Sequence, residues 1–179
     1  VPRNRNQALV VHDFLSGNFR VAGDYPLLDK FSKKKMIRGR FINQTDIDEK
    51  RKVVVISEEI YKQLFEKDAE MIDKYIQLNS MNFKVVGMFE TGNQNMGPTD
   101  DMHIPFTTFQ QIYNLGENIG FMMITGKPEY DIVQIESDAK LILRNLNNVH
   151  PEDNRAFGSF NLGKEFAKLN IKSFYLWGD

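Results

Sequence analysis

The sequence contains no cysteine, and it has no apolar stretch long enough to cross a bilayer. A disulfide framework, a thiol nucleophile and a cysteine-based zinc site are therefore excluded. Val53–Ile56 and Phe121–Ile124 are much shorter than the roughly 18 apolar residues that a membrane helix needs. The chain begins at Val1 rather than Met and shows no signal peptide. We therefore expect it to be a piece of a longer protein.

The motifs of common enzyme classes are also missing. There is no Gly-x-Gly-x-x-Gly, no Gly-x-Ser-x-Gly and no Gly-Lys-Ser/Thr loop, although Gly92 and Gly97 lie in a loop over 90–101. A net charge of −1 gives no reason to expect binding to nucleic acid. We predict no catalytic, cofactor-binding or metal-binding residues and no cofactor. A hydrolytic function is kept only as a remote alternative.

Three histidines are the remaining candidates for chemistry: His12, His103 and His150. None has a second histidine or a carboxylate at metal-ligand spacing on a predicted helix. His103 follows Asp100 and Asp101, and a strand would place His103 and Asp101 on one face. A weak metal site is the sharper interpretation of this pair. We favour an ordinary surface or loop histidine.

The stretch that organises the rest of the chain is a predicted hairpin over Tyr75–Phe89. Apolar and polar residues alternate along both halves, so each strand offers one apolar face. Asn79–Asn82 supplies polar turn residues between the two strands. Because a two-stranded hairpin is not stable alone, neighbouring segments must cover its apolar face. The residues expected on that face are Ile76, Leu78, Phe83, Val85, Gly87 and Phe89.

Several further strands and helices are predicted around this hairpin. Lys52–Ile56 reads as a buried strand, and Ser57 is placed to cap a following helix whose apolar face is Ile60, Tyr61, Leu64 and Phe65. Shorter strands are expected over 8–11, 18–21 and 101–105, with a turn over 22–26. Thr107 or Thr108 is expected to cap a helix carrying Phe109, Ile112 and Tyr113.

The last third of the chain predicts a strand, a long helix and a second strand. The strands are expected over 118–125 and 157–160, and the helix over 130–148. This order is that of one half of a split βαβ unit. Residues 162–179 are expected to form an amphipathic or juxtamembrane helix, with a sheet-packing helix as an equal alternative. The apolar stripe of the long helix is Ile132, Ile135, Ala139, Ile142, Leu146 and Val149.

A run of basic residues follows the first predicted strands: Lys33, Lys34, Lys35, Arg38 and Arg40. We interpret it as a solvated loop, which is how most charge runs behave. Contact with lipid head groups or an acidic partner is the sharper alternative. Asp46, Asp48 and Glu49 follow directly and weaken that alternative.

Six short motifs, taken in order, resemble the periplasmic core domain of MacB-like ABC transporter permeases of the FtsX and LolC type. That family has the series GR-x-F, VVVI, LF, I-x-I-x-G-x-x-F-x-VVGV and IP-x-T-T. This sequence lacks the family's Gly-Lys before the hairpin and has Met71–Lys74 there, and Asn79-Ser80 replaces the usual turn glycine. The matching segments here are Gly39–Phe41, Lys52–Ser57, Gln63–Phe65, Ile76–Asn79, Phe83–Met88 and Ile104–Thr108.

The resemblance implies an α+β fold with two lobes. A Sabre-like mixed lobe would occupy residues 1–117, and the C-terminal half of a Porter-like lobe, a split βαβ unit, would occupy residues 118–161. The first half of the Porter-like lobe would precede Val1, and residues 162–179 would be a juxtamembrane segment.

The resemblance also implies a function without catalysis. The domain would lie on the periplasmic side of the bacterial inner membrane and would couple cytoplasmic ATP hydrolysis to movement outside the membrane. Its partners would be the rest of a membrane-embedded, dimeric permease, an ATPase subunit or domain, and a periplasmic adaptor or lipoprotein. The alternative is an extracytoplasmic ligand-binding or scaffold module with a small-molecule cleft.

Overall fold

The chain divides into two units that are described separately. The barrel unit is Arg3–Asn118, and the split unit is Val1–Pro2 together with Ile119–Asp179. The computed structural model describes residues 1–29, 34–67, 69–90, 101–127, 129–150, 153, 155–161 and 173–178, the last six by their backbone alone. Among these described residues no helix is both long and apolar enough to cross a membrane.

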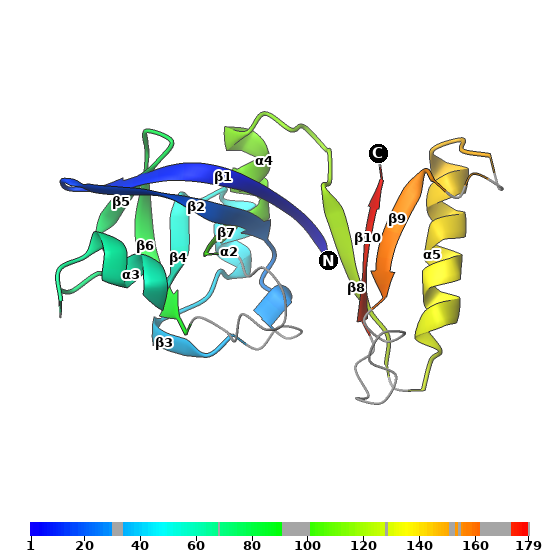
Figure 1. Ribbon diagram of the computed structural model, residues 1–179, viewed down its shortest axis with the longest axis horizontal. Helices are drawn as coiled ribbons and strands as arrows, with labels where there is room; N and C mark the ends of the chain where they lie inside the picture. Colours follow the sequence, from blue (N-terminus) through cyan, green and yellow to red (C-terminus); the bar gives the residue numbers. More distant parts are fainter. Residues whose placement is uncertain are drawn as a thin grey trace. The chain divides into compact units, whose positions relative to one another are not determined.

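Six strands of the barrel unit close into a ring (Figure 1). Their order is β2–β7–β4–β6–β5–β1, and β1 pairs back with β2. The β2/β7 and β4/β6 pairs are parallel, and the other pairs are antiparallel. The strands are β1 (Pro2–His12), β2 (Leu15–Asp24), β4 (Val53–Ser57), β5 (Tyr75–Leu78), β6 (Met81–Phe89) and β7 (Met102–Pro105).

The predicted hairpin is confirmed as β5 and β6, and its inward residues form part of the core. Ile76, Leu78, Phe83 and Val85 are each at most 1% exposed. The turn is shorter than predicted, because Leu78 pairs with Met81 and only Asn79 and Ser80 lie between the strands. Both have a left-handed backbone, with φ of 47° and 69°, which a two-residue type I′ turn requires.

The first two strands are longer than predicted. β2 continues through Asp24, so the turn expected to begin at Ala22 begins only after the strand ends. The reason is non-local, since the end of β2 pairs in parallel with β7, with Asp24 opposite Pro105. Residues 91–100 of the expected 90–101 loop lie outside the described residues.

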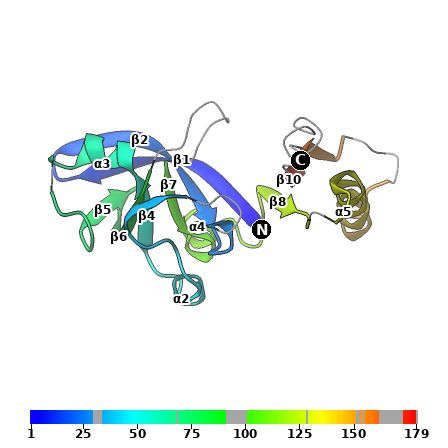
Figure 2. The same cartoon turned by 90° about the horizontal axis from the view of Figure 1, so that it is seen from below.

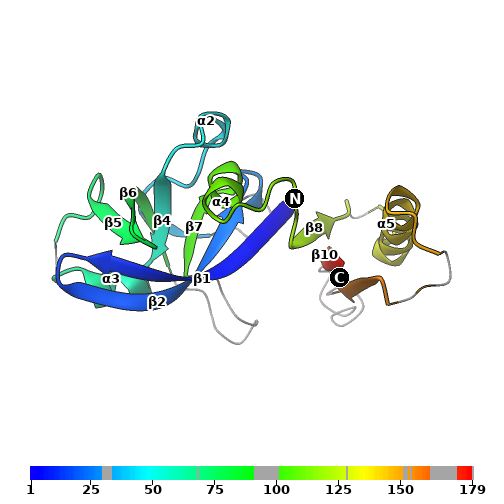
Figure 3. The ribbon, with the colours of Figure 1, turned by 90° about the horizontal axis from the view of Figure 1, so that it is seen from above.

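Short elements complete the barrel unit: β3 (Met36–Gly39), α2 (Gln44–Asp48), α3 (Glu58–Leu64) and α4 (Phe106–Ile112). Ser57 caps α3 as predicted, because its hydroxyl accepts a hydrogen bond from the Ile60 amide at 3.3 Å. The cap predicted for α4 is wrong, because Pro105 occupies the N-cap position. In Figures 2 and 3, α2 lies on the opposite side of this unit from the β1–β2 hairpin.

The split unit has the predicted order of strand, helix and strand: β8 (Phe121–Thr125), α5 (Ile132–Leu146) and β9 (Phe157–Asn161). A further strand, β10 (Ser173–Gly178), lies between β8 and β9 and is antiparallel to both. The two outer strands are therefore parallel, which is the topology of a split βαβ unit. The helix expected over residues 162–179 is wrong for 173–178, and residues 162–172 lie outside the described residues.

Helix α5 buries only part of its predicted stripe. Ile132 is 6% exposed and packs with Ile124 of β8 and with three residues of its own helix, Ile135, Ala139 and Leu143. Ile142 and Leu146 were also expected to be inward but are 58% and 73% exposed. The inward row of α5 includes Glu136 and Leu143 instead, and Leu146 is the last residue of the helix.

Candidate functional site: a buried charged network and a cationic pocket

A buried network joins three neighbouring strands of the barrel unit: Arg3 on β1, Asp24 at the end of β2, and His103 on β7. Arg3 donates from both Nε and Nη2 to the Asp24 carboxylate, the second at 2.9 Å, and His103 Nδ1 lies 2.6 Å from Asp24 Oδ2. Arg3 is 4% exposed, and Asp24 and His103 are fully buried. These contacts hold β1 and β7 against the two opposite edges of β2.

Asp24 is ionised and carries the negative charge of this network. Complete burial acts to raise the pKa of Asp24, but the Arg3 guanidinium and the hydrogen bond with His103 hold it well below its ordinary value. An ionised Asp24 only accepts hydrogen bonds, so His103 Nδ1 carries the proton that it donates. The rings of Phe41 and Phe89 flank His103 at centroid distances of 5.6 and 5.2 Å. Because all three groups are buried, this aspartate–histidine pair offers no surface to a substrate.

The expectation of a surface or loop histidine at 103 is wrong. His103 lies on β7, whose four residues are all buried because β2 and β4 flank it. Asp101 precedes the strand and is not a partner of His103. Its carboxylate accepts instead from the backbone amide of Arg20 at 2.8 Å and from the Arg20 side chain at 3.4 Å.

The other two histidines lie elsewhere. His12 stacks on Phe65 with 4.1 Å between ring centroids and contacts the Tyr75 carbonyl, and His150 is exposed in the split unit. Within the described part of the chain, no three histidine, aspartate or glutamate residues gather in a group that could hold a metal ion. Asp100 lies outside that part.

The Gly39–Phe41 motif crosses closely over β6. Gly39 has φ of +67°, and a Cβ atom there would lie 2.2 Å from the Val86 carbonyl oxygen. A Cβ atom at Gly87 would lie 2.2 Å from the Arg40 carbonyl oxygen. The two glycines therefore permit the crossing, which the Arg40 amide fastens by donating to the Val86 carbonyl at 2.9 Å. The crossing brings the Arg40 side chain towards α2.

Arg40 forms an ion pair with a second buried carboxylate of the barrel unit, while its own side chain stays partly exposed. It donates through two nitrogens to Asp46 on α2, at 2.6 and 3.1 Å, and the Asp46 side chain is fully buried. Burial acts to raise the pKa of Asp46, but the hydrogen bonds from Arg40 and from the Asn43 amide lower it.

The Thr107 and Thr108 hydroxyls of α4 do not cap a helix. They donate hydrogen bonds to the Ile47 and Arg51 carbonyls at 2.7 and 2.9 Å, and so connect α4 to α2 and to the segment that follows α2.

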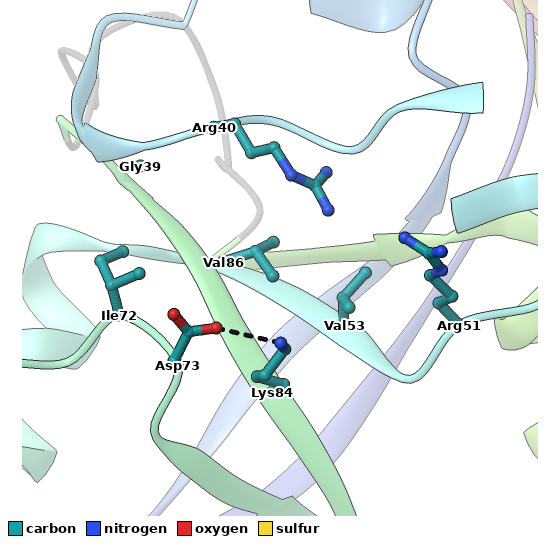
Figure 4. A pocket seen from close by; sticks show the side chains of 8 residues that line it. All are labelled: Gly39, Arg40, Arg51, Val53, Ile72, Asp73, Lys84 and Val86. Atoms are coloured by element: carbon teal, nitrogen blue, oxygen red, sulfur yellow. Dashed lines mark ion pairs between the residues drawn. The ribbon is translucent and has the colours of Figure 1, made fainter. Parts of the chain in front are cut away.

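A pocket of about 530 Å³ opens beside this pair (Figure 4). It has an apolar floor and three cationic side chains, each of which pairs with a carboxylate. Lys84 pairs with Asp73 at 3.0 Å, and Arg51 pairs with Glu49 at 2.8 Å. The pocket therefore has a volume suited to a small molecule, but its cations are already neutralised. The lining residues are Gly39, Arg40, Arg51, Val53, Ile72, Asp73, Lys84 and Val86.

The predicted basic run does not act as one patch. Lys35 pairs with Glu90 at 2.9 Å, and the Lys34 ammonium lies 4.3 Å from the centre of the Phe89 ring. Arg40 is engaged with Asp46 as described above. Lys33 lies outside the described residues. The solvated-loop interpretation is wrong for Met36–Gly39, which includes Arg38 and forms β3 because it pairs with β6. The separate contacts of the other residues do not form a single anion-binding surface.

The split unit has its own buried carboxylate, which fastens α5 to β9. Glu136 is 5% exposed and accepts hydrogen bonds from Ser159 Oγ at 2.5 Å and Asn161 Nδ2 at 2.6 Å. Lys140, one turn further along α5, lies 3.0 Å from the same carboxylate. No sequence pattern indicated the contacts from Ser159 and Asn161, because both lie more than 20 residues from Glu136 and meet it only in the folded unit.

Residues 2–142 match the family model of the MacB-like periplasmic core domain. The chain belongs to this family. The family is a domain of transporter permeases, and the resemblance drawn from the six motifs is confirmed. The mixed α/β fold is that of the MacB-like domains of known structure.

Two curated relatives match shorter stretches. An uncharacterized ABC transporter permease, YvrN, from Bacillus subtilis is 37% identical over 60 residues, which are 34% of this chain and 14% of that protein. The macrolide export ATP-binding/permease protein MacB of Chlorobaculum tepidum is 34% identical over 73 residues, 39% of this chain and 11% of that protein. The matched stretch is thus a small part of each relative.

Three solved structures share the fold at low sequence identity. The periplasmic region of MacB from Actinobacillus actinomycetemcomitans has a TM-score of 0.67 at 17% identity, over 83% of this chain and 66% of that one. The extracellular domain of the transporter YknZ from Gram-positive bacteria has a TM-score of 0.68 at 14% identity, over 84% and 76%. A domain of a putative permease from Porphyromonas gingivalis has a TM-score of 0.57 at 14% identity, over 99% and 72%.

Proposed function

We propose that this domain is a mechanical element of an ABC transporter permease, and that it converts ATP-driven movement of membrane helices into movement of its two units. The observation that supports the proposal is the location of the charged side chains of the barrel unit. The strongest polar groupings, Arg3–Asp24–His103 and Arg40–Asp46, have buried carboxylates that hold elements of the barrel unit together. Such pairs suit a part that keeps its shape under load better than a part that binds substrate.

We assign the Sabre-like lobe to the barrel unit, Arg3–Asn118. We assign the second half of the Porter-like lobe to residues 119–178, which extends it beyond the boundary at residue 161. Support for this extension comes from β10, which supplies the middle strand of the split unit. The first half of that lobe would come from residues preceding Val1.

The proposed surroundings of the domain follow from the same reading. The rest of the permease would be embedded in the inner membrane as a dimer, with this domain on its periplasmic side. An ATPase subunit or domain would act from the cytoplasm, and a periplasmic adaptor or lipoprotein would contact the domain from outside. The cargo would be exported or handled outside the membrane, as with drugs, peptides or lipoproteins.

Distance measurement in the full permease tests this function. The chain contains no cysteine, so Glu59→Cys on α3 and Asp138→Cys on α5 would introduce one spin label into each unit, at exposed positions. We expect the distance distribution between the labels to differ between the nucleotide-free permease and the permease trapped with ATP bound. An unchanged distribution in a permease that still hydrolyses ATP would exclude the proposed movement.

A further inference from the structure

The chain passes between the two units at two places, and both ends of the barrel unit are hydrogen-bonded within that unit. Arg3 is the first residue of the barrel unit and Asn118 is the last. Arg3 is bound to Asp24 and His103 in the buried network. The Asn118 carbonyl accepts a hydrogen bond from Asn4 Nδ2 at 3.2 Å, and Gln110 Nε2 lies within 3.4 Å of it.

These contacts link the entry and the exit of the chain to each other. Asn4, which reaches Asn118, is 4% exposed and is the direct neighbour of Arg3. The other end of strand β1 is quite different, because Phe14 in the turn of the β1–β2 hairpin is fully exposed. The buried ion pair of this hairpin thus lies where the chain enters the unit, whereas the polar contacts nearer its turn, such as that of His12 with the Tyr75 carbonyl, are exposed.

We infer that Arg3, Asn4, Asp24, His103 and Asn118, together the root network, are the positioning residues through which the barrel unit is driven. This inference rests on the proposed function. A force applied along β1 at Arg3 passes through Asp24 to β2 and through His103 to β7, and a force at Asn118 passes through Asn4 to the same strand. The barrel unit then moves as one body instead of fraying at its first residues.

The competing interpretation is that the network only stabilises the fold. Arg40 offers a control in the same unit, because it also donates through two nitrogens to a fully buried carboxylate, although its own side chain is 41% exposed where that of Arg3 is 5% exposed. Arg3→Gln and Arg40→Gln each break one such pair. Only the Arg3 change does so at the root network. Because it also removes the more deeply buried charge, the Tm of both variants is measured first, and their distance changes are compared at a temperature at which each is fully folded.

The test is the label-to-label distance in the full permease with Glu59→Cys and Asp138→Cys. We expect Arg3→Gln to lose at least half of the ATP-dependent distance change while ATP hydrolysis continues, and Arg40→Gln to keep it. A full distance change in Arg3→Gln, or an equal loss in Arg40→Gln, would overturn the inference. If the unsubstituted permease shows no ATP-dependent change, the proposed function fails instead.

A milder variant covers the case in which Arg3→Gln does not fold. Asn4→Ala leaves the Arg3 and Asp24 side chains in place and removes the hydrogen bond to the Asn118 carbonyl. We expect it to reduce the distance change and to raise amide hydrogen exchange at residues 4–8 of the full permease at least threefold. Unchanged exchange and an unchanged distance in a folded Asn4→Ala permease would contradict the inference.

Discussion

Asp24→Asn measures directly how much the buried network contributes to stability. The substitution leaves the Arg3 guanidinium, 4% exposed, without its counter-charge. Removing one partner of a buried ion pair costs about 3–5 kcal/mol. Because about 1 kcal/mol shifts the Tm of a chain of this size by roughly 2–4 °C, we expect the Tm to fall by about 6–20 °C.

The assay is thermal and urea unfolding at pH 7, followed by far-ultraviolet circular dichroism. Asp101→Asn is the control, because the Asp101–Arg20 pair is partly exposed, at 21% and 37% for the two side chains. That control should lose less than about 1 kcal/mol. A combined Arg3→Met and Asp24→Leu variant should recover only part of the loss, because no buried charge is left alone but the buried His103 Nδ1 loses the acceptor of its hydrogen bond. An Asp24→Asn variant as stable as the control would refute this reasoning.

The pH dependence of the same variant has a definite sign. Burial acts to raise the pKa of Asp24, but Arg3 and His103 outweigh it and lower the pKa in the folded chain. A lowered carboxyl pKa contributes stability that is fully present above the unfolded value, near 3.9, and is lost as the pH falls towards the folded value. The difference in unfolding free energy between the wild type and Asp24→Asn should therefore shrink below about pH 4. A difference that grows in acid would contradict the assignment.

Four further predictions concern local features. Ser57→Ala should cost about 0.5–2 kcal/mol in urea unfolding by removing the cap of α3, and no change would show that the cap contributes nothing. Ser80→Gly should raise the unfolding free energy by about 0.5–1 kcal/mol, because the Ser80 backbone has a left-handed conformation that glycine adopts more easily. A lower unfolding free energy would contradict this. Gly87→Ala should lower the Tm measurably, because the new Cβ would meet the Arg40 carbonyl oxygen at 2.2 Å, and an unchanged Tm would mean that the crossing adapts freely. Titration with octanoate, followed by nuclear magnetic resonance, should give no saturable shift at the pocket, since its cations are paired. Saturation at millimolar octanoate would instead favour the small-molecule alternative.

The features predicted well from the sequence are those set by neighbours along the chain. The alternation of apolar and polar residues over Tyr75–Phe89 identified β5 and β6. Ser57 was identified as the cap of α3 because it directly follows the buried strand Val53–Ile56. The six motifs identified the family, and the family model matches residues 2–142. These signals are local, so periodicity and cap chemistry suffice to find them.

The features missed depend on partners far away in the sequence. The burial of His103 follows from the pairing of β7 with β2 and β4, and its partner Asp24 lies 79 residues away. The apolar residues over 173–178 fit a helical spacing as well as a strand. These residues form a strand because they pair with β8 on one side and with β9 on the other. No local pattern carries either kind of information.

The position of β10 has a consequence for the order of folding. β8 and β9 are both bonded to β10, the last strand along the chain. During synthesis, the barrel unit has all of its strands once residue 105 has emerged, whereas the split unit must wait for residues 173–178. A ribosome stalled just after residue 161 should therefore display a protease-resistant barrel followed by a segment that proteases still digest.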